Sequence, residues 1–114
     1  MNGHFEAAGG VNGKPVDFLI DTGATSIALS HDDALRVGFT EADLSYSLII
    51  NTANGQARAA PVRLDTVTVG SVVREGLRAM VAEPCRLEQS LLGMNFISSL
   101  TAFEMRRDEV ILRD

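Results

Sequence analysis

Residues 18–25 read Phe-Leu-Ile-Asp-Thr-Gly-Ala-Thr, an apolar run that ends abruptly at a carboxylic acid. Three apolar residues in succession are typical of a strand that is buried on both faces. Asp21 is therefore expected at the edge of a dry core, where burial disfavours the charged form of a carboxyl group. Gly23 allows a tight turn and the close approach of a second backbone or a substrate, because it has no side chain. We therefore single out Asp21 as a candidate acid–base residue.

The Asp-Thr-Gly tripeptide also has a plain structural interpretation. All three residue types are common in turns, and at average composition such a tripeptide occurs by chance in roughly one chain of this length in fifty. A second apolar run gives the motif more weight. Residues 91–97 read Leu-Leu-Gly-Met-Asn-Phe-Ile, in which two apolar residues end at a glycine.

The remaining pattern predicts many short strands with turns at Gly and Asn, and therefore an all-β fold. Asn12-Gly13 and Asn54-Gly55 are typical of two-residue hairpin turns. Asp65 is interpreted as a turn residue between two strands. The expected strands cover residues 4–11, 15–20, 27–29, 46–52, 56–64, 66–69 and 72–81, followed by a terminal hairpin of 102–105 with 110–112.

Helical signals are few. Ser30 is followed three positions later by Asp33, which is typical of a helix N-terminus, and this helix should end at Gly38. Residues 95–100 form one or two helical turns in this interpretation. The 114 residues suit a single domain, 1–114, with one modest core that pairing of two chains would enlarge.

With both motifs in place, the chain resembles the retropepsin-like aspartic proteases, and among them the bacterial single-domain members. That family shows an apolar run followed by Asp-Thr-Gly-Ala, as in residues 18–25. It also shows two apolar residues and a Gly before a short C-terminal helix, as in residues 91–97. Residues 51–57 lie where the family has its flap. The resemblance spans about residues 4–112. It implies a closed, barrel-like β domain with one or two short helices, active as a C2 homodimer.

The resemblance implies an aspartic endopeptidase in which Asp21 is catalytic and Thr22, Gly23 and Ala24 complete the active-site loop. One chain supplies one carboxyl group, so two chains must bring their Asp21 residues together on a twofold axis. Two carboxyl groups so close share a proton, so that one activates a water molecule and the other protonates the substrate. We expect activity at acidic to mildly acidic pH, without a cofactor or a metal.

A polypeptide substrate is expected to bind as an extended strand beneath the central hairpin. The predicted flap residues are Thr52, Ala53, Asn54, Gly55 and Gln56. The predicted substrate-binding residues are Leu19, Ala28 and Leu91, with Ala24 beside them. Plain core packing explains Leu19 and Leu91 equally well, and Asn54-Gly55 also suits an ordinary surface turn.

The chain departs from the viral members of the family at three positions. Viral members place two acidic residues after the loop Ala and an Arg after the later Gly, and these residues form an ion-pair cluster near the dimer interface. Thr25, Ser26 and Met94 occupy those positions here. Both sides of the cluster are missing together, so we expect dimer contacts or subsite polarity that differ from the viral pattern.

Charge and composition argue against several other classes of protein. The net charge is −5 and the basic residues are scattered, which predicts no nucleic-acid partner. Cys85 is the single cysteine, so it is interpreted as a small buried hydrophobe. With only His4 and His31 beside it, a zinc site is not expected. No run reaches the roughly 18 apolar residues of a membrane span, so this segment is predicted to make no membrane contact.

Three questions stay open from the sequence. Bacterial relatives of this type often carry an N-terminal membrane anchor with the protease domain in the periplasm, and the resemblance implies the same location here. The chain could also be a non-catalytic dimeric interaction module in which the loop around Asp21 serves as a dimer contact. A third interpretation is a monomeric, latent fragment of a longer chain. Substitution of Asp21 and measurement of the oligomeric state distinguish these alternatives.

Overall fold

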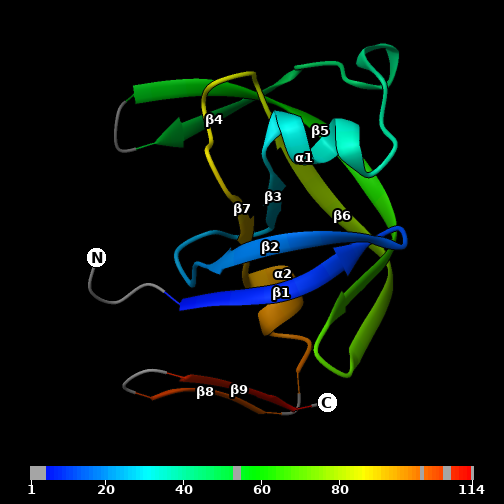
Figure 1. Ribbon diagram of the computed structural model, residues 1–114. Helices are drawn as coiled ribbons and strands as arrows, with labels where there is room; N and C mark the ends of the chain where they lie inside the picture. Colours follow the sequence, from blue (N-terminus) through cyan, green and yellow to red (C-terminus); the bar gives the residue numbers. More distant parts are fainter. Residues whose placement is uncertain (1–4, 53–54, 101, 107–108, 114) are drawn as a thin grey trace.

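In the part of the chain that the structure describes, seven strands form one sheet that closes on itself (Figure 1). The computed structural model describes residues 5–52, 55–100, 102–106 and 109–113, with side chains for 5–51 and 55–100. The strand order is β1-β2-β7-β3-β6-β5-β4, and β1 also pairs with β5. Six strands therefore form a closed barrel, and β4 extends the sheet beyond β5. The strands are β1 (Phe5–Val11), β2 (Lys14–Ile20), β3 (Ile27–Leu29), β4 (Leu48–Thr52), β5 (Gly55–Val69), β6 (Val72–Ala82) and β7 (Ser90–Leu92).

The first hairpin follows from its turn residues. Asn12 and Gly13 have φ angles of 52° and 83°. This is the left-handed conformation that a two-residue hairpin turn requires and that Asn and Gly adopt at little cost. β1 and β2 pair antiparallel along their whole length. The pairing carries Phe18 and Ile20 into the barrel core, where both are buried.

One expectation about the strands is wrong. Residues 56–64 and 66–69 belong to the single strand β5, and Asp65 lies inside it rather than in a turn. The reason is a contact from the first hairpin. The Asn12 side-chain oxygen accepts hydrogen bonds from the backbone amides of Asp65 and Thr66, at 2.8 and 3.1 Å. A residue 53 positions away in sequence therefore holds the chain extended at this point.

The helix α1 (His31–Arg36) begins where the sequence predicts. The Ser30 hydroxyl accepts a hydrogen bond from the backbone amide of Asp33, at 3.1 Å, and so satisfies an amide that has no partner within the helix. The helix ends before the predicted Gly38, whose φ of 115° lets the chain turn away. The other described helical segments are a 3-10 helix (Glu41–Asp43) and α2 (Met94–Ile97).

The core brings distant parts of the sequence together inside the barrel. Phe18 from β2 and Phe96 from α2 are fully buried. They pack in one cluster with Ile27 and Leu29 of β3 and Leu92 of β7. Because Phe96 anchors α2 in this cluster, the segment that follows the second apolar run is fixed against the strand that precedes Asp21.

The C-terminal segment forms the predicted hairpin. β8 (Ala102–Arg106) and β9 (Glu109–Arg113) pair antiparallel in a separate two-stranded sheet, which lies below β1 and α2 in Figure 1. The described structure is thus mostly strand, with a closed barrel and two short α-helices. This confirms the predicted fold class.

The prediction that Cys85 is buried is wrong. Its side chain is exposed and its φ is 66°. It lies in a turn that the backbone amide of Arg86 closes on the carbonyl oxygen of Glu83, at 3.2 Å. None of the described helices has the length and apolar character needed to cross a membrane.

Candidate active site

Asp21 lies at the point where β2 leaves the barrel sheet. β2 runs parallel to β7, with Ile20 opposite Leu92. The backbone amide of Asp21 donates to the carbonyl oxygen of Leu92, at 3.1 Å, which extends the pairing by one hydrogen bond. The backbone of Asp21 is therefore fixed by the sheet, while its half-buried side chain belongs to the loop that follows.

The loop of residues 21–26 folds back on the Asp21 carboxyl group. The backbone amide of Gly23 donates to Asp21 Oδ1 at 2.9 Å, and the amide of Ala24 donates to the Asp21 carbonyl oxygen at 3.1 Å. A Cβ atom at Gly23 would lie 3.2 Å from the same Oδ1, closer than most such contacts. The glycine thus lets a backbone amide approach the carboxylate and orient it.

The second apolar run lies directly against this loop. The amides of Met94 and Asn95 donate to the carbonyl oxygens of Ala24 and Thr25, at 2.8 and 3.1 Å. Gly93 packs so closely on the backbone of Ser26 that a Cβ atom would overlap its carbonyl oxygen. The two motifs that the sequence singled out, 66 or more positions apart, therefore form one unit in the structure.

Asn95 fastens this unit to the neighbouring strands, and sequence reasoning gave it no role. Its Oδ1 accepts from the backbone amide of Ile27 at 2.9 Å, and its Nδ2 donates to the carbonyl oxygen of Arg78 at 2.7 Å. One amide side chain thus links the Asp21 loop, where it enters β3, to β6. Its place two residues after Gly93 in the second motif was the signal for such a role.

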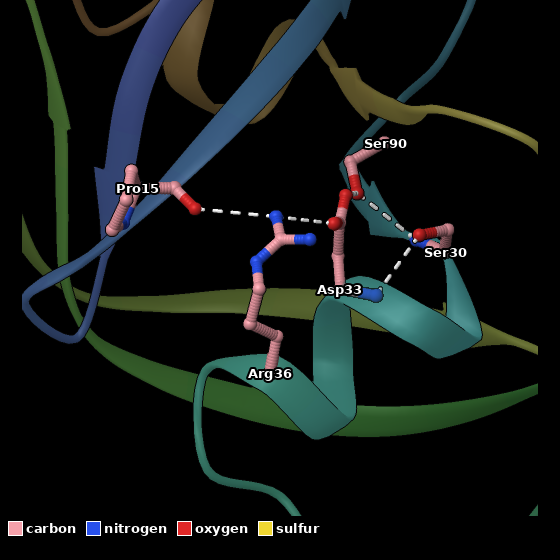
Figure 2. A network of polar contacts seen from close by, with 5 residues as sticks. All are labelled: Pro15, Ser30, Asp33, Arg36 and Ser90. Carbon is pink, nitrogen blue, oxygen red and sulfur yellow. Dashed lines mark hydrogen bonds and ion pairs between the residues drawn. The ribbon is translucent and has the colours of Figure 1, made fainter.

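A second polar network, which includes Ser90 of β7, supports the same region (Figure 2). Ser90 is fully buried; its hydroxyl accepts from the backbone amide of Ser30 at 3.0 Å and donates to Asp33 Oδ2 at 2.5 Å. Arg36 pairs with Asp33 at 2.5 Å and donates to the carbonyl oxygen of Pro15 at 3.2 Å. This network connects α1 to β7 and β2, the two strands that position Asp21.

A cavity of about 620 Å³ opens beside Asp21. The loop of residues 21–26 and β3 form one wall, and the β4–β5 hairpin, β6 and the segment before β7 form the others. Apart from Asp21, the charged residues that line it are Arg58 and Arg86. The lining residues are Asp21, Gly23, Ala24, Thr25, Ser26, Ala28, Ile50, Asn51, Ala57, Arg58, Ala59, Met80, Ala82, Arg86, Leu87 and Leu91.

The structure brings most of the predicted loop and substrate-binding residues to this cavity. Gly23, Ala24, Ala28 and Leu91 line it with Asp21, and Ala28 lies opposite Leu91 where β3 pairs with β7. Thr22 is exposed and does not line it. Leu19 lies on β2 opposite Leu91, half-buried and outside the cavity lining of the single chain.

The predicted flap corresponds to the end of the β4–β5 hairpin. Thr52 and Gly55 are paired, and Gly55 has a φ of 105°. Gln56 lines a smaller adjoining cavity of about 370 Å³, while Ala53 and Asn54 lie outside the described residues. The hairpin borders the active-site cavity with residues nearer its base, namely Ile50, Asn51, Ala57 and Arg58.

Several lining residues were missed by sequence reasoning. Ile50 pairs with Ala57, the last residue of the expected flap range 51–57, so the hairpin turn at Gly55 was the signal for it. Met80 lies on β6, parallel to β3 and paired with Ala28, a contact that no local pattern indicates. Arg86 and Leu87 lie in the segment between β6 and β7, whose path depends on the closed barrel.

The chemistry of the described site is that of one oriented carboxyl group facing a largely apolar cavity. No group of three or more His, Cys, Asp or Glu side chains within the described residues is arranged to hold a metal ion. A carboxyl group can serve as general acid or base for a substrate in the cavity.

Comparisons with known proteins agree with this geometry. Residues 7–99 match the family described as gag-polyprotein putative aspartyl protease. An uncharacterized protein from the 5′ region of cobV in a Sinorhizobium species is 46% identical over all 114 residues, which cover 49% of its length. An uncharacterized protein of Rickettsia prowazekii (strain Madrid E) is 36% identical over 97% of this chain and 47% of its own length. The chain thus spans about half the length of these curated relatives.

Two solved structures share the fold. A retropepsin-like aspartic protease from Rickettsia conorii matches with a TM-score of 0.85 and 36% identity, over 97% of this chain and 83% of that one. The EIAV protease complexed with the inhibitor HBY-793 matches with a TM-score of 0.74 and 18% identity, over 93% and 96% of the two chains, which shows the fold alone. Because the family match covers most of the sequence and both motifs meet at one cavity, the chain belongs to the gag-polyprotein putative aspartyl protease family and is a retropepsin-like aspartic protease in sequence family and in fold.

Proposed function

We propose that the protein is an endopeptidase that hydrolyses peptide bonds with a water molecule held between two Asp21 carboxyl groups, one from each chain of a homodimer. The observation that carries this proposal is the orientation of Asp21. Its Oδ1 is held by the Gly23 amide at 2.9 Å while the residue lines a cavity of about 620 Å³. A carboxyl group that only ended a turn would not need a cavity beside it.

In the proposed reaction, one Asp21 accepts a proton from the water as the water attacks the substrate carbonyl carbon. The other Asp21 donates its proton to the carbonyl oxygen. As the intermediate collapses, the proton taken from the water passes from the first Asp21 to the leaving nitrogen, and the second Asp21 regains a proton from the intermediate's hydroxyl group. Two carboxyl groups on a shared twofold axis disfavour double ionisation, so the pair holds one proton and titrates jointly. Acidic to mildly acidic pH keeps that proton in place. No covalent intermediate is needed.

The cavity shape supports an extended polypeptide as substrate. Ala24, Ala28 and Leu91 lie on one side of the cavity, and Ile50 and Ala57 lie on the hairpin side. Apolar walls of this kind accept apolar side chains, while the backbone of β4 or of the Asp21 loop offers hydrogen bonds to a strand-like ligand. We propose Thr52 to Gln56 as the end of the hairpin that covers such a ligand.

Substitution of Asp21 tests the proposal. Purified Asp21→Asn protein should cleave an unfolded substrate such as casein about 10³-fold more slowly than the wild type, between about pH 3 and pH 7, because the amide can neither accept nor release the proton. The matched control is Asp17→Asn. Asp17 is an exposed carboxylate on β2, the strand that precedes Asp21, outside the cavity lining, and its loss should leave the cleavage rate unchanged.

Equal cleavage by wild type and Asp21→Asn would show that the activity comes from another source. Failure of the wild type to cleave at every pH tested would contradict the protease function. Such a result would favour the non-catalytic interaction module, in which the loop around Asp21 is only a dimer contact. Circular dichroism of both variants establishes that each protein is folded before the rates are compared.

A further inference from the structure

Two arginines face the active-site cavity from the side of the hairpin. Arg58 lies on β5, opposite Ile49 of β4, and Arg86 lies in the segment between β6 and β7. Both line the cavity beside Asp21, and both also line the adjoining cavity of about 370 Å³. In Figure 1 the yellow segment before β7 runs up to the green β4–β5 hairpin, above the loop that follows β2. Both arginines therefore line the same end of the cleft.

Neither guanidinium group has an acidic partner in the described structure. Within residues 5–51 and 55–100, no ion pair joins Arg58 or Arg86 to a carboxylate. One carboxylate, Glu83, lines the adjoining cavity with both arginines. Its Oε1 accepts a hydrogen bond from the backbone amide of Arg58, at 3.2 Å. Glu83 thus fixes the turn of residues 83–86 to β5 and leaves both cationic side chains unpaired.

The charge of the smaller cavity, two arginines against one glutamate, is opposite in sign to that of the whole chain. The chain carries ten Lys and Arg residues against fifteen Asp and Glu, a net charge of −5. The residues that line either cavity include two arginines and, beyond Asp21, the single carboxylate of Glu83. Because both arginines are exposed and have no ion-pair partner among the described residues, their guanidinium donors are available to a ligand of negative charge.

We propose that Arg58 and Arg86 form a subsite for an acidic side chain, so that this protein prefers polypeptides with Asp or Glu near the cleaved bond. The inference rests on the proposed function and adds a substrate class to it. The planar guanidinium group presents paired donors that match the two oxygens of a carboxylate. Because both arginines lie on the hairpin side, the acidic residue of the substrate binds beyond the apolar walls that surround Asp21.

The size of the preference follows from the exposure of the pair. Both arginines remain accessible to solvent, and a solvent-accessible ion pair is worth at most about a fivefold change in an equilibrium constant. We therefore expect the wild type to cleave a Glu-containing peptide with a kcat/KM about fivefold above that of its Gln counterpart. Salt should weaken this preference, because it screens accessible charges.

The experiment uses pairs of peptides that contain one bond cleaved by the wild type. Each pair differs only by Glu or Gln at one position, which is moved in turn through the four positions on either side of the bond. Acetylated N-termini and amidated C-termini make the varied Glu the sole carboxylate of the peptide, so a terminal carboxylate cannot take its place. The ratio of kcat/KM for each pair is measured with wild type, Arg58→Gln, Arg86→Gln and the double variant.

The control variant is Arg63→Gln. Arg63 is an exposed arginine of the same strand, β5, and lines neither cavity. Its substitution removes the same charge from the chain and should leave the Glu-to-Gln ratio at the wild-type value. In the double variant the ratio should fall to about one. In the wild type it should also fall to about one when the pH drops below about 4, since the peptide Glu then becomes neutral.

Each outcome bears on one proposal or the other. A wild type that cleaves both members of every pair at equal rates overturns the acidic subsite and leaves the protease function intact. A double variant that keeps the wild-type ratio overturns the roles of Arg58 and Arg86. A wild type that cleaves no peptide, with Asp21→Asn equally inert, overturns the protease function together with this inference. A ratio that is lost in the double variant and retained in Arg63→Gln supports the subsite.

Discussion

Gly23 and Gly93 serve the same carboxyl group in different ways. Gly23 brings its amide to Asp21 Oδ1, whereas Gly93 allows the second apolar run to pack on the backbone of Ser26. Neither glycine has a positive φ, so close approach, rather than backbone conformation, explains their presence. The position of Asp21 thus depends on the lack of a Cβ atom at these two glycines as well as on hydrogen bonds.

Substitution of Gly93 by Ala should be strongly destabilising. The added Cβ atom would overlap the carbonyl oxygen of Ser26, which itself lies in the Asp21 loop, so both segments must shift. We expect a loss of about 2–3 kcal/mol in the free energy of unfolding, measured by urea denaturation. Gly38→Ala is the control, because Gly38 has open space around it and a φ of 115°. It should lose only about 1 kcal/mol through its backbone conformation. Equal losses would contradict the packing explanation.

At the scale of single residues, the sequence predicts what is local. The apolar run before Asp21 and the glycine after it form a pattern within a few positions, and the structure places the run in the barrel and Asp21 and Gly23 at the cavity. Arg58 and Arg86 are different, because exposed charged residues follow no period that a sequence reveals. Both line the same cavity because of the β4–β5 register and the path of the segment before β7. Cys85 was assigned to the core by its average tendency, and the turn that holds it exposes it instead.

At the scale of elements, the short strand β7 depends on a side chain for part of its support. β7 has three residues and pairs with β2 and β3. Ser90, the first residue of β7, is fully buried. Its hydroxyl donates to Asp33 of α1 and accepts from the backbone amide of Ser30, the residue before α1. A strand so short gains little from its own backbone pairing, so the Ser90 contacts fix its orientation beside Asp21.

Ser90→Ala should therefore cost about 1–3 kcal/mol in the free energy of unfolding. The substitution leaves the backbone amide of Ser30 without its acceptor and removes the hydrogen bond that Asp33 accepts in the interior. The measurement is again urea denaturation. Ser71→Ala provides the control, since Ser71 is exposed in the turn between β5 and β6 and should change stability by less than about 0.5 kcal/mol. A Ser90→Ala protein as stable as this control would show that the network carries no stability.

Elements were predicted well where their signals are local. The turn at Asn12-Gly13 and the Ser30 cap both occur as expected, because each depends on residues within four positions. The division of β5 at Asp65 failed because the deciding partner, Asn12, is 53 positions away in sequence. A contact of that span becomes visible only when β1 closes the barrel against β5.

At the scale of the whole molecule, closure of the barrel determines what one chain can do. The β1–β5 pairing closes the six-stranded barrel and leaves the Asp21 loop and the β4–β5 hairpin on either side of the cavity. The described chain contributes one oriented carboxyl group to that cavity. Both the acid and the base of the proposed reaction are Asp21, so activity should depend on two intact chains in the same particle.

Mixing wild-type chains with Asp21→Asn chains tests this dependence directly. If chains exchange freely and every active particle needs two Asp21 residues, an equal amount of Asp21→Asn leaves about a quarter of all dimers wild type, which halves the total cleavage rate. Addition of the same amount of Asp17→Asn should instead about double the rate, because those chains keep Asp21 and pair productively. The rate should also fall more steeply than the protein concentration on dilution, as dimers dissociate. A wild-type rate that is indifferent to added Asp21→Asn, under conditions where labelled chains are seen to exchange, would mean that one chain acts alone. The second catalytic group would then have to be sought within that same chain.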